Sequence, residues 1–584
     1  MPSVRWMQNK PPGPSGIEEL NPATIPKRKL YTKSFMGGKG NHLAENDFIY
    51  LCKMNTIGKN FLFSILSGVL LSIPWLFPHT GLLLLFAWVP LLWMEQEFTA
   101  SGKKGCWKYY ALTFLVWNAL AVFWIWNITP AGGVFAVVGN AFQMYLIFLL
   151  FRLFKKMLLK KGYATFVAYI FLAVLWIAWE HFYFDAEISF PWLVLGNGFA
   201  NNIRLIQWYE WTGALGGTAW VFLCNVLLFF AFTAKHPKVI YRVAAVCILL
   251  PVAGSVIRFY TYEEVPDPVE VVVLQPNIDP TPGGEKFNGL SQDAQDERLF
   301  ALADQQVTAS TDYVFAPETF TQNVVETMLL TNPTLQRIQR FVHRFPNVAF
   351  VTGASTARVY ENAASRPTPT ARRSGRLWYD AFNSAMFMDT TDRVGIYHKS
   401  KLVVGAEKMP FVEKFPIVEK MALDLGGTTG SLGTQKNREV FTHAGHAGKV
   451  GVAICYESIY GAFFTEYVTK GATLMSVITN DGWWGNTPGY RQHLSYASLR
   501  AIETRRSIAR SANTGVSALV NQRGERLAQT KWWEPAVLKG TLNLNDKLTF
   551  YVRHKDLVGT GASWLMLACV LFWGIMACSP RKRH

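Results

Sequence analysis

The sequence predicts a polytopic α-helical membrane domain of about eight spans joined to one extracytoplasmic α/β domain. Two observations carry this prediction. Half of the 584 residues are hydrophobic and only 17% are charged, which is too apolar for an ordinary water-soluble enzyme. The longest apolar runs lie before residue 258 and after residue 561, whereas the segment between them has the mixed pattern of a globular domain.

The first 59 residues are polar, rich in Gly, Pro and Lys, and show no apolar periodicity. We expect residues 1–59 to form a disordered cytoplasmic leader, without the pattern of a cleavable signal peptide. Because Met54 lies just before the first apolar run, we expect translation to start there and the residues upstream to be an extension of the gene model.

Eight apolar runs approach the roughly 20 residues that a helix needs to cross about 30 Å of hydrocarbon. Seven lie within residues 60–257, and the eighth lies with a basic tail in residues 562–584. The second run is short, so a re-entrant or interfacial helix remains an alternative there. The predicted spans are Asn60–Phe77, Gly81–Met94, Tyr109–Ile128, Gly133–Phe151, Ala164–Trp179, Gly213–Phe232, Val239–Ile257 and Ala562–Cys578.

The charges in the loops predict the orientation, because Lys and Arg in short loops favour the cytoplasm. The loops after spans two, four and six are basic, whereas loops 79–80 and 129–132 contain neither Lys nor Arg. We therefore expect both termini in the cytoplasm and residues 258–561 outside it. The Lys and Arg that give the net charge of +17 lie largely in short loops between apolar runs, so their placement indicates membrane orientation, and we expect no nucleic-acid partner.

The external segment, residues 258–561, has the size of one large domain. Short β-rich runs alternate in it with helical stretches, which predicts a layered α/β domain. The expected strands are Val269–Leu274, Tyr313–Ala316, Val348–Thr352, Ala385–Met388, Val450–Ile454, Leu474–Ile478 and Val516–Val520. The expected helices include Gln292–Val307, Leu335–Phe345 and Arg491–Ser511.

Of the seven cysteines, Cys455 is the only one that this topology places in the external domain. It therefore has no partner there for a disulfide, and is either a small buried hydrophobic residue or a reactive thiol. Cys455 follows the apolar run Gly451–Ile454, where a strand should end. A strand-to-helix turn exposes a nucleophile at the edge of a sheet, and a helix N-terminus would favour the thiolate.

Two further strand ends supply candidate partners for this thiol. Glu318 follows the run Tyr313–Ala316 and could act as a general base, and Lys399 follows Tyr397-His398 and could stabilise an oxyanion. Taken singly, each is as readily a helix cap or a solvated surface side chain. The chain has no His and Cys at metal-ligand spacing and no Gly-rich phosphate motif, so we expect no metal and no cofactor.

In this order, Glu318, Lys399 and Cys455 resemble the Glu–Lys–Cys triad of the nitrilase superfamily. Together with eight spans and a domain between the seventh and eighth, they resemble the apolipoprotein N-acyltransferase family from about Asn60 to the C-terminus. The resemblance implies a nitrilase-like αββα sandwich. It also implies that Cys455 is the nucleophile, Glu318 the base and Lys399 the cation that stabilises the oxyanion.

The resemblance extends to residues around the triad. It implies supporting roles for Glu407, Tyr456 and Glu457. The chain departs from the family pattern in three places: Lys401 stands where a His is usual, residues 404–406 replace a Pro-Phe-Gly segment, and Phe287 stands where a Trp is often found. The spacing of Glu407 is nevertheless retained. The residues expected to bind substrate are Phe287, Asn383, Trp483 and Trp484.

The resemblance implies a ping-pong reaction through a thioacyl enzyme. A phospholipid would donate the acyl chain, and the diacylglyceryl-cysteine of an apolipoprotein would accept it in the last step of lipoprotein maturation. We expect a monomer in the bacterial inner membrane, with its catalytic domain on the periplasmic side. Met409–Ile417 and Gly426–Gly433 are candidate lids, although plain surface loops fit equally well.

Two rival functions remain. One is a membrane-tethered carbon–nitrogen hydrolase that uses the same triad with water as acceptor, although a tether needs only one span. The other is a transporter or sensor with an external binding domain. The predicted spans contain almost no ionisable residues near mid-membrane apart from Glu180 and His181 at one edge, and no internal repeat is evident, which disfavours transport.

Overall fold

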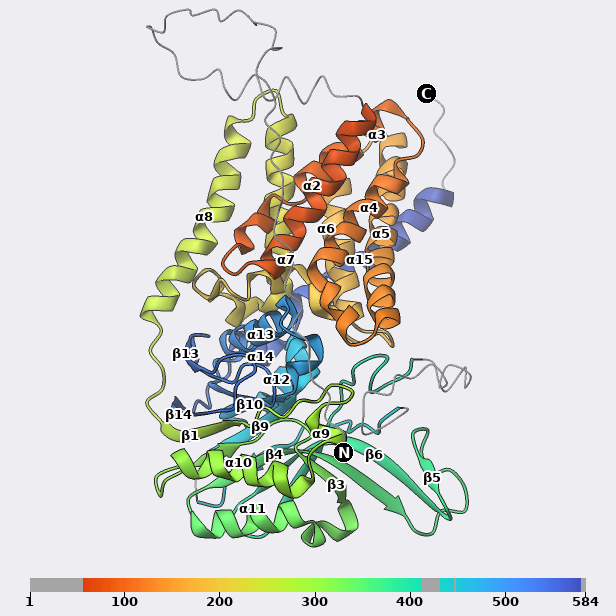
Figure 1. Ribbon diagram of the computed structural model, residues 1–584. Coiled ribbons are helices and arrows are strands. Elements are labelled where there is room, and N and C mark those ends of the chain that lie inside the picture. The colour runs from red at the N-terminus through yellow and green to blue at the C-terminus, as the bar shows by residue number, and fades with distance from the viewer. Residues whose placement is uncertain (1–55, 411–430, 446–447, 579–584) are drawn as a thin grey trace, which may run out of the picture. The chain divides into compact units, whose positions relative to one another are not determined.

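The computed structural model describes residues 56–410, 431–445 and 448–578 (Figure 1). Nearly all of the expected leader, including Met54, lies outside the described residues, as does the basic tail from residue 579 onward. Most of the two candidate lids falls within residues 411–430 and is likewise outside them. From Ile57 onward the described chain forms one compact unit.

Eight helical segments among the described residues are long and apolar enough to cross a membrane, which confirms the eight predicted runs. The short second run lengthens to Gly81–Ser101, because a 3₁₀ segment leads into a helix that continues past Met94. The segments are α2 Thr56–Leu76, η1 Gly81–Leu85 with α3 Val89–Ser101, α4 Trp107–Val122 with η2 Phe123–Asn127, α5 Pro130–Lys160, α6 Thr165–Tyr183, α7 Tyr209–Thr233, α8 Lys238–Thr261 and α15 Leu557–Cys578.

Aromatic side chains fill the space between these helices. The indole of Trp88 meets that of Trp176 edge-on at 4.7 Å between ring centroids, and lies 5.0 Å from the ring of Phe222. Nearer the end of α5, the buried ammonium of Lys155 forms an ion pair with the buried Glu95. Both charged residues lie just beyond the ends of the predicted spans, so the sequence did not predict a buried ion pair between the helices.

Between α6 and α7 the chain forms three short 3₁₀ turns instead of a plain loop. They are η3 Pro191–Leu193, η4 Leu195–Phe199 and η5 Ile203–Leu205. Residues 191–200 are buried, and the Glu180 carboxylate in α6 accepts a hydrogen bond from the Leu195 backbone N–H at 2.9 Å. This folded connection forms part of the surface on which the α/β domain packs.

The α/β domain contains two stacked sheets. One has the order β14-β1-β2-β4-β6-β5, with β3 on β4 and β7 on β6, and the other has the order β13-β12-β11-β10-β9-β8. The first sheet comprises β1 Pro268–Gln275, β2 Tyr313–Phe315, β3 Thr321–Val325, β4 Ala349–Tyr360, β5 Arg372–Ser374, β6 Leu377–Met388, β7 Val394–His398 and β14 Ala536–Asn543. The second comprises β8 Val440–Thr442, β9 Lys449–Ile454, β10 Leu474–Thr479, β11 Ile508–Ala512, β12 Ala518–Val520 and β13 Arg526–Gln529.

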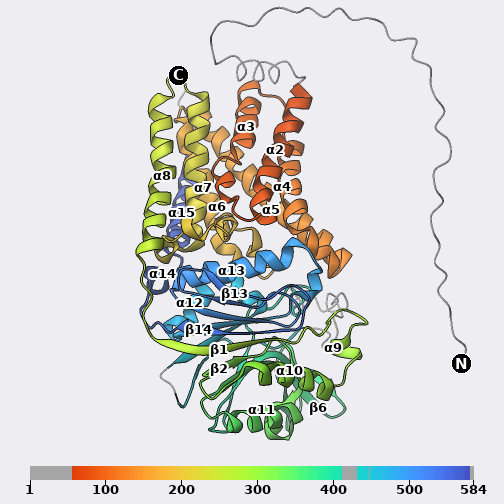
Figure 2. The same cartoon turned by 60° about the vertical axis from the view of Figure 1, so that its left-hand side comes forward.

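Helices cover the outer face of each sheet, so the layers are αββα, as the family resemblance implies (Figure 2). Strand β1 shows how both faces are filled: Val271 and Val273 point into the core between the sheets, whereas Val272 and Leu274 pack beneath the outer helices. The first sheet is covered by α10 Gln292–Gln306 and α11 Pro333–Arg344, and the second by α12 Gly461–Thr469 and α13 Pro488–Thr504.

One predicted helix, Arg491–Ser511, is wrong over its last third. Helix α13 ends at Thr504, because the next residue, Arg505, adopts a left-handed φ of 50°, and strand β11 then begins at Ile508. Strands β3, β5, β7, β8, β13 and β14 were also not predicted. They are short or carry exposed polar residues, so they lack the apolar runs on which the prediction relied.

Candidate active site

Cys455 follows β9 directly and begins the 3₁₀ segment η8 Cys455–Ile459. We call residues 454–458 the Cys455 turn. Strands β9, β10 and β11 run parallel, so this turn lies at the carboxyl edge of the sheet, where the sequence predicted it. Cys455 has a φ of 50°, in the left-handed region that residues with a side chain rarely adopt. Backbone strain of this kind is common at functional sites.

The expected helix N-terminus behind the cysteine is wrong. A five-residue 3₁₀ segment follows Cys455, which is too short to supply a helix dipole. Burial and the carboxylate of Glu318 raise the pKa of the Cys455 thiol well above its ordinary value, and the ammonium of Lys399 opposes them only in part. The resting thiol is therefore protonated at neutral pH and needs a base to become a nucleophile.

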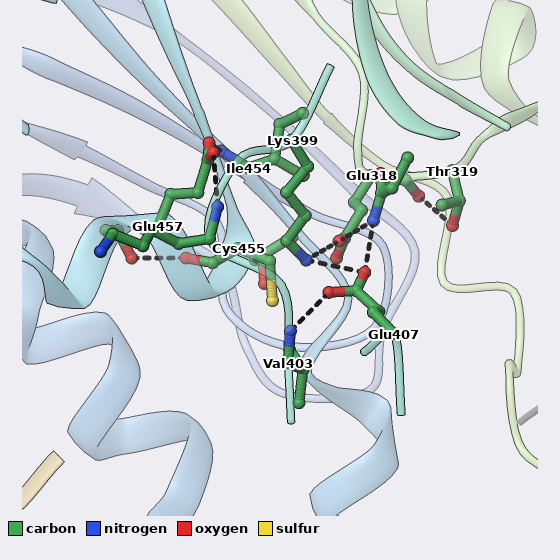
Figure 3. A network of polar contacts seen from close by, with 12 residues as sticks. Glu318, Thr319, Lys399, Val403, Glu407, Ile454, Cys455 and Glu457 are labelled. Atoms are coloured by element: carbon green, nitrogen blue, oxygen red, sulfur yellow. Dashed lines mark hydrogen bonds and ion pairs between the residues drawn. The ribbon is translucent and has the colours of Figure 1, made fainter. Parts of the chain in front are cut away.

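A cluster of four residues, here called the charged cluster, lies beside the thiol. Figure 3 labels three of them, Glu318, Lys399 and Glu407, and the fourth, Asn383, is hydrogen-bonded to both glutamates. The Lys399 ammonium lies 3.1 Å from Oε1 of Glu318 and 2.9 Å from Oε1 of Glu407. The amide nitrogen of Asn383 donates to the same two oxygens, at 2.8 Å each. In Figure 3 the sulfur of Cys455 points toward this cluster. The structure thus brings together four residues that the sequence placed in the site.

The fold explains why these residues meet. Glu318 follows β2, Asn383 lies within β6, and Lys399 follows β7. Strands β6 and β7 pair antiparallel, and the Lys399 backbone N–H donates to the Asn383 carbonyl at 2.8 Å. Glu407 reaches the cluster from the loop after β7, where its other oxygen accepts the backbone N–H of Val403 at 2.9 Å. Glu407 thus contacts Lys399 and Asn383 although residues 404–406 depart from the family pattern.

Lys399 is only 1% exposed, yet it keeps its charge. Burial by itself lowers the pKa of a lysine, but Glu318 and Glu407 outweigh burial and hold the pKa of Lys399 well above its ordinary value. A buried cation fixed beside a thiol is suited to stabilising negative charge that develops on a neighbouring oxygen.

Glu457, expected to support the site, is fully buried and does not belong to the charged cluster. Its carboxylate accepts the backbone N–H of Ile454 at 2.8 Å and that of Ser400 at 2.7 Å. The hydroxyls of Tyr397 and Tyr467 donate to it at 2.7 and 3.2 Å. Burial raises the pKa of Glu457, although these hydrogen bonds oppose the shift. Glu457 therefore joins the Cys455 turn to the loop that carries Lys399.

Tyr456 points toward the membrane helices and away from the charged cluster. Its hydroxyl donates to the backbone carbonyl of Ser189, in the connection between α6 and α7, at 2.9 Å. The hydroxyls of Tyr460 and Ser189 also lie 2.9 Å apart. Tyr456 thus fixes the Cys455 turn to the membrane part of the chain.

The aromatic residues expected to bind substrate separate into two groups. The rings of Phe287 and Trp483 are stacked at 6.3 Å between centroids, with both side chains partly exposed. Trp484 is buried instead against Trp124 and Trp192 of the membrane part, at 4.9 and 5.7 Å. Phe287 and Trp483 therefore remain available to a substrate, whereas Trp484 belongs to the contact between the two parts.

The sequence did not predict the contacts that two lysines near the site make. Lys286 is buried, and its ammonium donates to the Glu318 carbonyl at 3.0 Å and to the Thr319 hydroxyl at 2.7 Å. Burial lowers the pKa of Lys286 to about 8, against the opposing effect of Glu318. Lys401, at the position of the usual His, reaches the connection after α6 and pairs with Asp185 at 2.8 Å. Only the adjacency of Lys286 to Phe287 could have indicated its place.

Two family models match separate parts of the chain: Carbon-nitrogen hydrolase over residues 275–547, and Apolipoprotein N-acyltransferase N-terminal domain over residues 67–227. An apolipoprotein N-acyltransferase of Chlorobaculum tepidum is 32% identical over 86% of this chain and 94% of its own length. The chain belongs to the apolipoprotein N-acyltransferase family. Family members from Geobacter metallireducens and Thermotoga maritima are 27% and 25% identical over 90% and 84% of this chain, and over 96% and 90% of their own lengths.

Membership of the apolipoprotein N-acyltransferase family confirms two expectations from the sequence. The protein is a multi-pass membrane protein, and it is an acyltransferase of the nitrilase superfamily. The names of the relatives state the reaction. The order of its steps and the residues that perform them have to be inferred from the geometry of this site.

Proposed function

We propose that the protein moves an acyl chain from a phospholipid to the α-amino group of a diacylglyceryl-cysteine apolipoprotein, with Cys455 as the transient carrier. The observation that carries this proposal is the buried thiol beside a buried lysine that two glutamates hold in its charged form. In the resting site the thiol is neutral, so the reaction begins with transfer of its proton to Glu318.

The first half-reaction forms a thioester. As Glu318 accepts the thiol proton, the sulfur of Cys455 bonds to the carbonyl carbon of the sn-1 ester, and the carbonyl oxygen becomes an oxyanion. Lys399 and a backbone N–H near Tyr456 stabilise this oxyanion. When the ester C–O bond breaks, Glu318 returns the proton to the departing glycerol oxygen. A lysophospholipid leaves and the acyl chain remains on the sulfur.

The second half-reaction forms an amide. The α-amino nitrogen of the apolipoprotein bonds to the thioester carbon, Glu318 removes an amine proton, and Lys399 again stabilises the oxyanion. The C–S bond then breaks and the thiolate of Cys455 recovers the proton from Glu318. The site returns to its resting state and the N-acylated lipoprotein departs.

The contact between the α/β domain and the membrane helices suits two lipid-anchored substrates. Tyr456 bonds Ser189, and Trp484 packs on Trp124 and Trp192, so the Cys455 turn lies against the membrane part. Acyl chains can enter from the side at this junction, while a closely packed protein surface limits the access of water that would hydrolyse the thioester. A soluble hydrolase of small amides has no need of this arrangement.

Acylation of a synthetic diacylglyceryl-cysteine lipopeptide by the purified protein tests the proposal. The wild-type protein should acylate the peptide amine with phospholipid as donor, and Cys455→Ser should lose the activity. Cys224→Ser is the matched control, because Cys224 is buried in α7 and takes no part in the proposed reaction. Release of ammonia from small amides without lipopeptide acylation would instead favour the hydrolase.

We also propose that residues 258–561 form the catalytic domain on the periplasmic side of the bacterial inner membrane. The distribution of Lys and Arg between alternate loops supports this orientation. A cysteine at the exposed Ser365, in the loop between β4 and β5, should react with an impermeant maleimide in intact spheroplasts. A cysteine at the exposed Lys160, the last residue of α5, should react only after lysis; the reverse pattern would place the domain in the cytosol.

A further inference from the structure

Helix α13 carries two consecutive buried side chains, Gln492 and His493, that serve different parts of the molecule. The Gln492 amide hydrogen-bonds segments of the membrane part, and the His493 ring hydrogen-bonds the Cys455 turn. Because adjacent residues of a helix share a rigid backbone, a displacement of one is passed to the other.

Gln492 uses the full hydrogen-bonding capacity of its amide on the membrane part. Its nitrogen donates to the backbone carbonyls of Trp75 in α2, at 2.9 Å, and Ala121 in α4, at 3.0 Å. Its oxygen accepts the indole N–H groups of Trp124 in η2, at 3.2 Å, and Trp192 in η3, at 2.6 Å. One side chain of the α/β domain therefore fixes its helix to four membrane-part segments.

His493 holds the turn that carries the thiol. Its Nε2 lies 3.1 Å from the Cys455 carbonyl oxygen and 2.9 Å from the Ser458 hydroxyl, which itself donates to that carbonyl at 2.7 Å. Its Nδ1 lies 3.0 Å from Oδ1 of Asp481, whose other oxygen pairs with Arg510 at 2.6 Å. The imidazole is thus anchored on one side and directed at the Cys455 backbone on the other.

The backbone at Cys455 requires such restraint. A left-handed φ at a residue with a side chain persists only when the surrounding structure enforces it. His493 and Ser458 both contact the carbonyl of this residue, and they therefore restrain the backbone that carries its thiol. Loss of either contact frees the turn to relax toward an ordinary conformation.

We propose that Gln492 and His493 are positioning residues that couple the Cys455 thiol to the packing of the membrane helices. His493 keeps the Cys455 turn in its reactive conformation, and Gln492 fixes the position of His493 relative to the helices between which lipid substrates must enter. The proposal rests on the proposed function, because it assumes that Cys455 carries the acyl chain.

The first experiment compares His493→Ala with His493→Gln in nanodiscs, because a glutamine can place an N–H donor near the position of Nε2. The single-turnover rate of lysophospholipid release should fall about 100-fold in His493→Ala, the order expected for a displacement of about 1 Å at a reacting atom. The KM for phospholipid should stay unchanged, and His493→Gln should recover part of the rate. Wild-type rates in both variants would overturn the proposal.

Gln492→Leu tests the coupling to the membrane part, and Tyr496→Phe is its matched control. Tyr496 lies one turn further along α13 and bonds two of the four segments that Gln492 bonds, through the Trp192 carbonyl at 2.7 Å and the Trp75 indole at 3.2 Å. Both variants should lower the midpoint of thermal unfolding, but only Gln492→Leu should slow lysophospholipid release by about 10-fold or more. Equal rates in the two variants would contradict the coupling.

Alkylation separates failure of this inference from failure of the proposed function. The rate at which iodoacetamide modifies Cys455, followed by mass spectrometry of its peptide, does not depend on acyl transfer. His493→Ala should change the rate and its pH profile because the turn relaxes, and His493→Gln should restore the wild-type profile. If wild-type protein acylates nothing, the proposed function fails, while an unchanged alkylation profile in His493→Ala would still overturn the positioning role.

Discussion

The carboxylate of Glu457 accepts the backbone N–H of Ser400 at 2.7 Å, and this bond joins the Cys455 turn to the loop after Lys399. The two residues are far apart in sequence: Glu457 follows β9 of one sheet, and Ser400 follows β7 of the other. Because the other carboxylate oxygen holds the N–H of Ile454, one buried side chain sets the distance between the thiol and the lysine. This relationship assigns Glu457 a positioning role without any contact with the substrate.

Glu457→Gln should therefore impair both folding and acyl transfer. A glutamine has one acceptor oxygen, so its NH₂ group would face either the Ile454 or the Ser400 N–H. We expect the free energy of unfolding to fall by about 1–3 kcal/mol, and acyl transfer to fall about 100-fold. Glu534→Gln, which weakens an exposed ion pair with Lys531, is the control and should change neither quantity appreciably. Similar behaviour of the two variants would contradict the role of Glu457.

Lys399→Met should abolish most activity and also destabilise the protein, because it leaves two carboxylates together without their cation. We expect kcat for lipopeptide acylation to fall by about 100- to 1,000-fold, the range found when a single oxyanion donor is removed. Lys401→Met, two residues away, should retain most activity. Adding Glu407→Gln to Lys399→Met should recover stability but not kcat, because it removes repulsion without restoring the cation. Recovery of activity in the double variant would contradict the proposed role of Lys399.

Glu318→Gln should have opposite effects on two reactions of Cys455. Glu318 raises the pKa of the thiol, so its neutralisation should lower that pKa and shift alkylation by iodoacetamide toward lower pH. Acyl transfer should nevertheless be lost, because no base remains to carry the proton to the glycerol oxygen. Mass spectrometry of the Cys455 peptide and a lipopeptide assay measure the two effects. Parallel changes in both would show that Glu318 acts only through the thiol pKa.

His398, the residue before Lys399, should make the stability of the protein depend on pH. Burial lowers the pKa of His398 to about 4, with Arg358 acting in the same direction and Glu326 opposing it. Between that pKa and the unfolded pKa of 6.5, His398 binds more protons in the unfolded chain than in the folded protein. The stability is therefore fully present above pH 6.5 and is lost as the pH falls toward 4. The loss should reach about 3 kcal/mol at most.

Thermal unfolding of the protein in nanodiscs at several pH values measures this dependence. His398→Gln should show a shallower loss of stability between pH 6.5 and 4 than the wild-type protein. His343→Gln is the control, because His343 lies on the surface in a half-exposed pair with Asp392. An equally steep loss in His398→Gln would assign the acid sensitivity to other groups.

Much of the site could be predicted because its residues follow strand ends. Glu318 and Cys455 follow apolar runs that form parallel strands, and parallel strands bring such positions to the carboxyl edge of their sheet. Lys399 ends a Tyr-x-Lys segment and follows β7, which pairs antiparallel with β6. The membrane spans could be predicted from length and hydrophobicity alone, and the structure extends them by a turn or more at several ends.

The remaining features depend on contacts between residues far apart in sequence. The left-handed Arg505 that ends α13 has no local signal, so the predicted helix ran into β11. The raised pKa of Cys455 follows from burial and from Glu318, neither of which a sequence displays. Likewise, Gln492 is an ordinary polar residue until the structure places two indoles and two carbonyls around its amide.

The most direct test of the account is intact mass spectrometry of the purified protein after incubation with phospholipid alone. We predict that one acyl chain is added, that it maps to the peptide containing Cys455, and that lipopeptide removes it while becoming N-acylated. The adduct should be absent from Cys455→Ala. Lipopeptide acylation by Cys455→Ala, or turnover by the wild-type protein without any acyl adduct on Cys455, would contradict the thioacyl mechanism.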